Sequence, residues 1–196
     1  VRPLLEACIR HRRDCLIMSL GGLLPAPELM AQAHAYGVKI RIPSGAICGL
    51  DGIRAAKEAG LERVTLTTRK PPKGLVGAPH LVANKIDLDS ITEPTVVFEG
   101  TALDAVVAFP KNVNVAAGLS LAGLGPEKTT VRVVADPTTD ANSHEVVAEG
   151  VFGRLCTVTE NMPSPRNPKS SYLASLSAPA ELRAAALEFQ EKHVTK

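Results

Sequence analysis

The sequence predicts an α/β protein: the end of an open parallel sheet, followed by an α+β domain with a mixed or antiparallel sheet. Two observations support this fold class. The first 45 residues alternate helical and strand patterns, which is the order of elements in an open α/β sheet. From residue 129 onward, three strand patterns follow one another with only turn-rich stretches between them, which is typical of an α+β domain.

Residues 1–12 predict a helix, because apolar side chains recur there at helical spacing. Residues 15–20 are apolar without alternation, which favours a parallel strand covered on both faces. A second helix over 26–36 ends at Gly37, and a strand follows over 38–45. No strand with a G-x-G-x-x-G turn precedes these elements, so we expect the start of the sheet to be absent from these residues.

The middle of the chain predicts two strands and three helices. Asp51 is placed as the N-cap of a helix that ends near residue 60, and a strand over 61–70 stops at two prolines. Residues 73–93 have no sustained period and predict a long loop. After a strand over 94–100, Thr101 and Asp104 form a capping box for the next helix. Asn112 is the natural N-cap of a third, apolar helix.

The last strands and the final helix complete the prediction. We expect strands over 129–136, 144–150 and 152–160, paired antiparallel, and then a helix from residue 167 to the end. Pro179 should kink this helix or restart it with Ser177 as the new N-cap. One face of the helix carries an apolar stripe that should pack back on the first segment: Leu173, Leu176, Ala180, Ala184 and Leu187.

The composition excludes several classes of protein. Of 196 residues, 45% are hydrophobic and 21% charged, as in ordinary globular proteins, and the net charge of +2 is too small to argue for nucleic acid or membrane binding. The four cysteines form no CxxC pair and no set with zinc-ligand spacing, so we expect no metal site. Without a signal peptide or a long apolar stretch, we expect a cytoplasmic protein with reduced thiols.

His144 is the most informative candidate residue. It stands at the start of a predicted strand, directly after the turn-rich residues 136–143. Asp136 or Asp140 could orient its ring and raise its basicity, which would suit general acid–base catalysis near neutral pH. A structural histidine in a turn is the alternative, and spacing alone leaves both open.

Two other places could contact a ligand. Residues 41–52 combine a strand end, a Ser-Gly turn and a helix start, where backbone N–H groups can face a bound molecule. Asn114 is expected as a buried amide in the first turn of an apolar helix, where a ligand would be a good partner. A plain strand-to-helix turn and a plain helix cap are the respective alternatives.

Several blocks taken together resemble the L-aspartate dehydrogenase family: "IRIPSGAICGLDGIRAA", "VTLTTRKPPKGL", "EPTVVFEGTALDAVVAFPKNVNVAAGLSLAGLG", "VRVVADP", "HEVVAEGVFGR" and "ENMPSPRNPKSSYLASLSA". The resemblance implies a two-domain enzyme. Residues 1–43 would then be the C-terminal part of a Rossmann-type nucleotide-binding domain, 44–168 a catalytic and dimerisation domain, and 169–196 a helix packing back on the first domain. It also implies a homodimer, with Ala46 and Asn114 as contacts of NAD or NADP and His144 as the active-site histidine.

The activity implied by this resemblance is NAD(P)-dependent oxidative deamination of L-aspartate to iminoaspartate and then oxaloacetate and ammonia, and the reverse, serving pyridine nucleotide biosynthesis. A dicarboxylate substrate calls for cations, for which we consider Arg69, Lys70 and Lys169, with Ser170 and Thr101 as donors; solvated surface charge is the alternative. Another NAD(P)-dependent two-domain reductase, similar to dihydrodipicolinate reductase, or a non-catalytic dimerisation module would also fit. Without the nucleotide-binding fingerprint, we expect these residues alone to be inactive.

Overall fold

A mixed five-stranded sheet is the centre of the computed structural model, which describes residues 1–110 and 114–194, with the side chains of 167–169 and 193–194 excepted. The strands lie in the order β4-β5-β3-β6-β7. Only the β3–β5 pair is parallel, and the other three pairs are antiparallel. The predicted fold class is therefore confirmed. The strands are β3 (Leu61–Lys70), β4 (Thr95–Thr101), β5 (Thr129–Ala135), β6 (Asn142–Gly150) and β7 (Gly153–Asn161).

The pairing of the last three strands differs from the prediction. β6 and β7 form the expected antiparallel hairpin, but β3 lies between β5 and β6. The link over residues 136–141 therefore crosses the end of β3. Local patterns reveal strands but not their partners, because the insertion of β3 depends on contacts between residues 65 or more positions apart.

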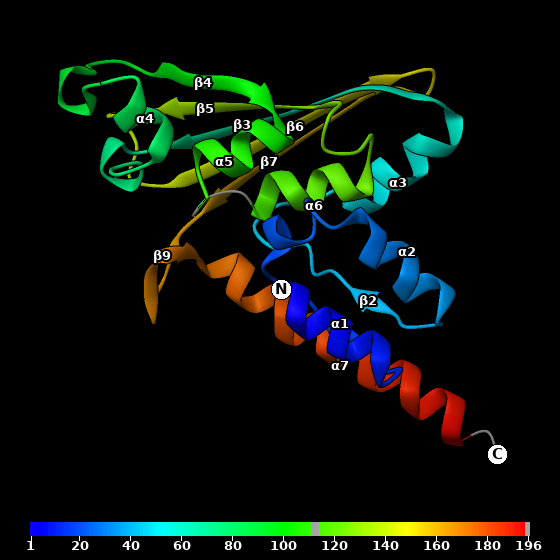
Figure 1. The fold of residues 1–196 in the computed structure, drawn as a ribbon. Coiled ribbons are helices and arrows are strands. Elements are labelled where there is room, and N and C mark those ends of the chain that lie inside the picture. Colours follow the sequence, from blue (N-terminus) through cyan, green and yellow to red (C-terminus); the bar gives the residue numbers. More distant parts are fainter. Residues whose placement is uncertain (111–113, 195–196) are drawn as a thin grey trace.

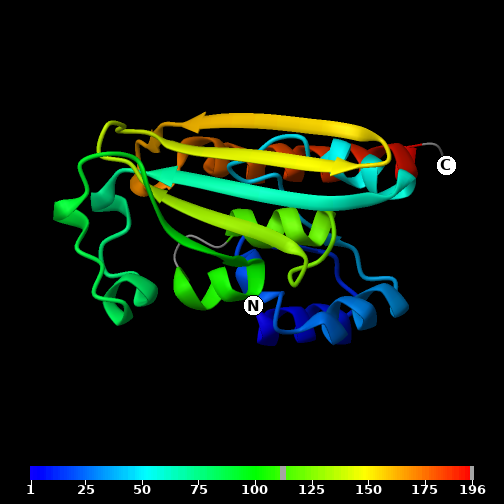
Figure 2. The same ribbon diagram turned by 90° about the horizontal axis from the view of Figure 1, so that it is seen from above.

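Three helices cover one face of this sheet (Figure 1): α3 (Leu50–Ala59), α5 (Ala102–Ala108) and α6 (Asn114–Ala122). The main core lies between them and the inward side chains of the strands, which include Val64, Leu66 and Val146. Seen from above, no helix of the described residues covers the opposite face (Figure 2), and Val158 on that face is 56% exposed. The expected homodimer stays a prediction.

The first segment forms a second, smaller sheet. β1 (Cys15–Leu16) pairs parallel with β2 (Ile40–Arg41), as expected, but both strands are short and half-buried and not covered on both faces. α1 (Arg2–Arg10), η1 (Leu20–Gly22) and α2 (Pro27–Ala35) pack a second apolar cluster that also includes Ala117 of α6. The domain boundaries proposed above stay a prediction.

Helix starts follow the cap rules at α5 but not at α3. At α5, the Thr101 hydroxyl accepts a hydrogen bond from the Asp104 N–H at 3.1 Å, and the Asp104 carboxylate accepts one from the Thr101 N–H at 2.9 Å, so the predicted capping box is confirmed. At α3 the N-cap is Gly49, and Asp51 lies inside the first turn, so that prediction was wrong. Gly49 has φ 78°, a left-handed conformation that glycine adopts without strain. Asn112 lies outside the described residues.

Residues 73–93 contain short helical turns that no sequence period could reveal. They include η2 (Pro72–Gly74), α4 (Pro79–Ala83) and η3 (Leu88–Ser90). Leu75 and Leu81 anchor this excursion in the main core. The His80 ring lies 5.1 Å from that of Phe98 and 5.8 Å from that of Phe109, which gives this histidine a packing role.

The C-terminal segment starts differently from the prediction. Residues 167–171 are not helical: β9 (Asn167–Ser171) pairs antiparallel with β8 (Pro163–Ser164), and α7 (Tyr172–Val194) follows. Pro179 lies inside this single helix and does not restart it. Ser177 is no N-cap, because its hydroxyl donates back to the Ala174 carbonyl at 2.8 Å.

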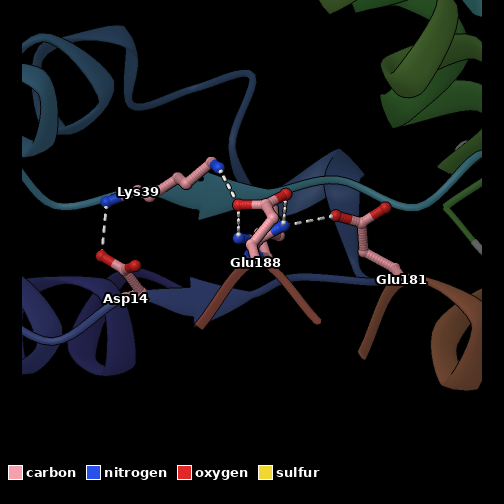
Figure 3. A network of polar contacts seen from close by, with 5 residues as sticks. Asp14, Lys39, Glu181 and Glu188 are labelled. Carbon is pink, nitrogen blue, oxygen red and sulfur yellow. Dashed lines mark hydrogen bonds and ion pairs between the residues drawn. The ribbon is translucent and has the colours of Figure 1, made fainter. Parts of the chain in front are cut away.

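The contacts of α7 come from a face other than the predicted stripe. Half-buried residues on that face include Ala174, Ala178 and Ala185, with Glu181 and Glu188. Leu173, Leu176 and Leu187 of the predicted apolar stripe are 40–59% exposed, so the stripe does not make the expected contact. Instead, Arg41 of β2 donates to Glu188 through both terminal nitrogens, at 3.1 and 2.6 Å, and to Glu181 at 3.2 Å (Figure 3). Hydrogen bonds from Arg41 lower the pKa of Glu188 to about 2. None of the helices among the described residues has the length and hydropathy of a membrane span.

Candidate active site

Four polar side chains form a polar row on the helix-covered face of the sheet: Thr68 and Lys70 of β3, His144 of β6 and Thr159 of β7. In the register of the strands, His144 of β6 stands opposite Thr68 of β3 and opposite Thr159 of β7. His144 and Thr68 are each only 4% exposed. Because alternate strand residues share a face, Lys70 projects from β3 on this same side, two positions beyond Thr68. A polar row thus interrupts the apolar core at one end of the sheet.

Thr68, and not an aspartate, orients the imidazole of His144. The Nδ1 atom lies 3.1 Å from the Thr68 hydroxyl. Asp136 is instead bound to Arg69 and Thr138, and the Asp140 side chain is fully exposed beside Lys73, so neither carboxylate has the predicted role. Among the described residues, Thr68 is the hydrogen-bond partner of the ring at Nδ1, and none of them bonds Nε2. Within the described part of the chain, the ring is therefore held at one nitrogen.

Burial and the nearby charge of Lys70 lower the pKa of His144 to about 4. The imidazole is therefore neutral at pH 7, and its ionisation lies well below the near-neutral range expected from the sequence. A neutral ring has one N–H and one free lone pair. If Nδ1–H donates to the Thr68 oxygen, Nε2 carries the lone pair, which is the form that can accept a proton from a substrate.

Lys70 supplies a cation next to this histidine. The residue is 9% exposed, and burial lowers its pKa to about 8. Its side chain lines a cavity of about 10 Å³ together with Thr68, Leu75 and Phe109. That cavity has room for about one water molecule and is too small for an amino acid. An amino acid therefore does not fit into this cavity as it stands.

The turn before α3 lies against β7. The carbonyl oxygen of Ala46 accepts hydrogen bonds from the Thr159 hydroxyl at 2.8 Å and from the Asn161 amide at 3.0 Å. Asn161 in turn accepts one from the Ser171 hydroxyl at 2.6 Å. Ala46, predicted as a nucleotide contact, is thus connected through Thr159 to the strand position opposite His144. The structure brings Ala46, Thr159 and His144 together.

Asn114 is the first residue of α6 and is exposed, so the expected burial of its amide was wrong. Its side-chain oxygen accepts a hydrogen bond from the Gly21 N–H at 3.2 Å, which connects α6 to η1 of the first segment. An exposed amide keeps its two N–H donors accessible to a ligand.

The remaining candidates do not join the polar row. Arg69 points to the opposite face from Lys70 and pairs with Asp136 at 2.8 Å. The Thr101 side chain takes part in the capping box of α5. Thr101 pairs with Thr130 of β5, whereas Lys70 pairs with Ala135 of the same strand. These two positions on β5 are five residues, or about 17 Å, apart, so Thr101 lies away from the polar row. Ser170 lies on β9, next to Ser171, and the Lys169 side chain lies outside the described part. Their roles at the substrate stay predictions.

Sequence reasoning missed Thr68, Thr159, Asn161 and Ser171. The one available signal was the alternation of Thr157, Thr159 and Asn161 along β7, where a buried strand face would otherwise carry apolar residues. In the described part of the chain, no group of three or more metal-ligating side chains gathers at one place.

Replacing Thr68 by valine tests how the imidazole is oriented. The change keeps the shape and removes the hydroxyl that bonds Nδ1, so the ring loses its fixed tautomer and orientation. We expect the turnover number of Thr68→Val to fall by about 10-fold or more. Thr68→Ser keeps the hydroxyl and should keep most of the wild-type turnover number. Steady-state kinetics of both variants measure this, and equal turnover of wild type and Thr68→Val would show that another group orients the ring.

By its fold the chain is an α/β protein, with a buried lysine and a neutral imidazole at one end of its mixed sheet. Comparison with known proteins makes this more specific. A family model described as "Aspartate dehydrogenase, C-terminal" matches residues 51–185. The L-aspartate dehydrogenase of Methanosarcina mazei is 49% identical over 186 residues, which are 93% of this chain and 69% of that protein. The chain therefore belongs to the aspartate dehydrogenase family.

More distant relatives agree with this assignment. The L-aspartate dehydrogenase of Nitrosopumilus maritimus is 46% identical over 181 residues, covering 91% of this chain and 66% of that protein. The crystal structure of aspartate dehydrogenase from Thermotoga maritima has a TM-score of 0.68 and 28% identity, covering 91% of this chain and 72% of that one. The resemblance seen in the sequence is confirmed.

Proposed function

We propose that this chain provides the substrate site of an L-aspartate dehydrogenase that uses NAD or NADP. The observation that carries the proposal is the buried ammonium of Lys70 on the same sheet face as the neutral, Thr68-bound imidazole of His144. A cation binds a carboxylate of the substrate, and a neutral imidazole accepts a proton. Both groups suit the deamination of an acidic amino acid. The names of the relatives support aspartate as that amino acid.

In this proposal, Lys70 binds one carboxylate and His144 moves the proton. The positive charge of Lys70 contributes to the low pKa of His144. A bound carboxylate offsets that charge, so the pKa of His144 rises when the substrate arrives. The imidazole then accepts a proton from the substrate ammonium, or from the water that hydrolyses the imine, through Nε2. Thr68 holds the ring in place for both steps.

The turn around Ala46 and the exposed amide of Asn114 fit one part of a nicotinamide nucleotide. Gly45 has φ +67°, and a Cβ built there would meet nothing within 4 Å, so the backbone is open to a planar or charged group beside it. A bound nicotinamide would supply the acceptor for the hydride from Cα. The chain's own part is to hold that group and to exclude water. A role in pyridine nucleotide biosynthesis belongs to the same proposal.

The direct test is a substrate screen with the purified full-length protein. We expect L-aspartate to reduce NAD or NADP with release of ammonia, and oxaloacetate with ammonia to reverse the reaction. The formation of reduced cofactor and of ammonia is measured for aspartate, glutamate and malate in parallel. Reduction of dihydrodipicolinate with no turnover of aspartate would instead identify the alternative reductase, and no turnover with any substrate would favour a non-catalytic module.

Replacing Asn114 by alanine should weaken the binding of the cofactor more than the binding of aspartate. The change removes the exposed amide donors and also the acceptor of the Gly21 N–H. We expect KM for the cofactor to rise by about 10-fold, with KM for aspartate nearly unchanged, because the loss of one hydrogen bond to a ligand costs about 1–1.5 kcal/mol. Initial rates at varied concentrations of each substrate separate the two constants. A selective rise in KM for aspartate would place Asn114 at the substrate instead.

A further inference from the structure

Three side chains of β7 face the turn that precedes α3. Thr157, Thr159 and Asn161 alternate along the strand, so all three point to the helix-covered side. Each donates a hydrogen bond to a backbone carbonyl of this turn: Thr157 to Cys48 at 3.4 Å, and Thr159 and Asn161 to Ala46 at 2.8 and 3.0 Å. The turn is therefore held by side chains and not by the backbone ladder of a sheet.

Asn161 makes the central contact. The residue is 2% exposed, and both ends of its amide have partners: the nitrogen donates to Ala46, and the oxygen accepts from Ser171. Ser171 stands at the end of β9, and its oxygen also lies 3.4 Å from the Ala174 N–H in the first turn of α7. One buried amide thus connects the turn, the end of β7 and the start of α7.

Besides these hydrogen bonds, the side chain of Ile47 anchors the turn, since it is 2% exposed and packs in the main core. Gly45 and Gly49 both have positive φ, which lets the chain reverse between β2 and α3 without regular hydrogen bonding. The approach to β7 is close, because a Cβ built on Gly49 would lie 2.9 Å from Cγ2 of Thr157. Small changes at Asn161 should therefore move the Ala46 backbone relative to the strand position opposite His144.

We infer that Asn161 is a positioning residue. It sets the distance between the turn before α3, which contains Ala46, and the polar row of the sheet, which contains His144. The inference rests on the proposed function, in which the turn contacts the nicotinamide nucleotide and His144 faces the substrate. Asn161 touches neither of them. It acts through the Ala46 carbonyl, and it fixes how far the cofactor side of the site lies from the substrate side. Misplacement by about 1 Å can cost about 10²-fold in rate.

Asn161→Asp is the sharpest test, because it exchanges one nitrogen for one oxygen. The new carboxylate can still accept from Ser171, but it has no N–H for Ala46 and repels that carbonyl oxygen. In the full-length protein we expect kcat to fall about 10- to 10²-fold and KM for NAD(P) to rise, while KM for aspartate changes less than about threefold. With Cα-deuterated aspartate, the isotope effect on kcat should increase, because hydride transfer becomes slower relative to product release.

Asn84→Asp is the matched control, since this exposed amide likewise donates to a backbone carbonyl, that of His80 at 2.8 Å, on another element of the fold. It should leave every constant unchanged. If Asn161→Asp does not fold, Ser171→Ala is the second variant. It removes the hydrogen bond that supports the amide, together with the long contact to the Ala174 N–H, and should lower kcat and raise KM for NAD(P) to a smaller extent. Two results would overturn the inference. One is an Asn161→Asp protein with unchanged kcat and unchanged KM for NAD(P). The other is a loss of activity that is explained entirely by the smaller fraction of folded protein. If wild type binds NAD(P)H but does not oxidise aspartate, the proposed function fails, while an unchanged NAD(P)H affinity in Asn161→Asp would separately refute the positioning role.

Discussion

His144→Ala should lower kcat for aspartate oxidation by about 10²-fold or more, because a general acid–base group typically contributes 10²- to 10⁴-fold. Thr68 and Lys70 stay in place in this variant, so substrate binding is kept and KM for aspartate should change little. Cofactor affinity should also persist, since the proposed nucleotide contacts are Ala46 and Asn114. The comparison of kcat with both KM values measures this pattern.

The control for this variant is His34→Ala, which removes an exposed imidazole from α2 and should leave turnover intact. Thermal unfolding of both variants separates lost chemistry from lost structure. Wild-type turnover in a folded His144→Ala protein would make the histidine structural. Because burial and the charge of Lys70 lower the pKa of His144 to about 4, kcat/KM should show no ionisation of this ring between pH 6 and 7.

The sequence predicted the elements of this fold better than their partners. Helix and strand periodicity located α1, α2, α5 and most strands, and the Thr101 capping box was visible in four residues. The insertion of β3 between β5 and β6 was not visible, because strand pairing depends on long-range contacts. The same holds for β9, a short strand that needs β8 as its partner and that the sequence assigned to a helix.

The candidate site was predicted only in part for a related reason. His144 and Ala46 were found through a resemblance of motifs, but the residues that orient them come from other strands. Thr68 is 76 positions before His144, and Asn161 is 115 positions after Ala46. Lys70 and Arg69 are neighbours in the sequence and looked equivalent, yet strand alternation turns them to opposite faces. Only the register decides which cation meets the histidine.

Lys70→Met should weaken aspartate binding by about 10²-fold, since removing one partner of a buried charge pair costs about 2–5 kcal/mol. Methionine keeps the length and apolar character of the stem that lines the small cavity beside Phe109. The variant should stay folded. The pKa of Lys70 is lowered in the folded protein, so burial opposes folding while the amine is protonated, and this penalty is fully present below about pH 8. The free energy of unfolding at pH 7 should therefore not decrease.

The pH dependence of this interaction distinguishes a substrate-binding lysine from a structural one. Lys70 is cationic below its pKa of about 8, so kcat/KM for aspartate should fall as the pH rises through that value. Lys70→Arg stays charged at higher pH and should shift this loss upward, whereas Lys70→Met should be weak at every pH. Lys73→Met, which removes an exposed cation three residues away, is the matched control and should behave as wild type. Wild-type KM for aspartate in Lys70→Met would assign the carboxylate to another cation and leave Lys70 with a purely structural role.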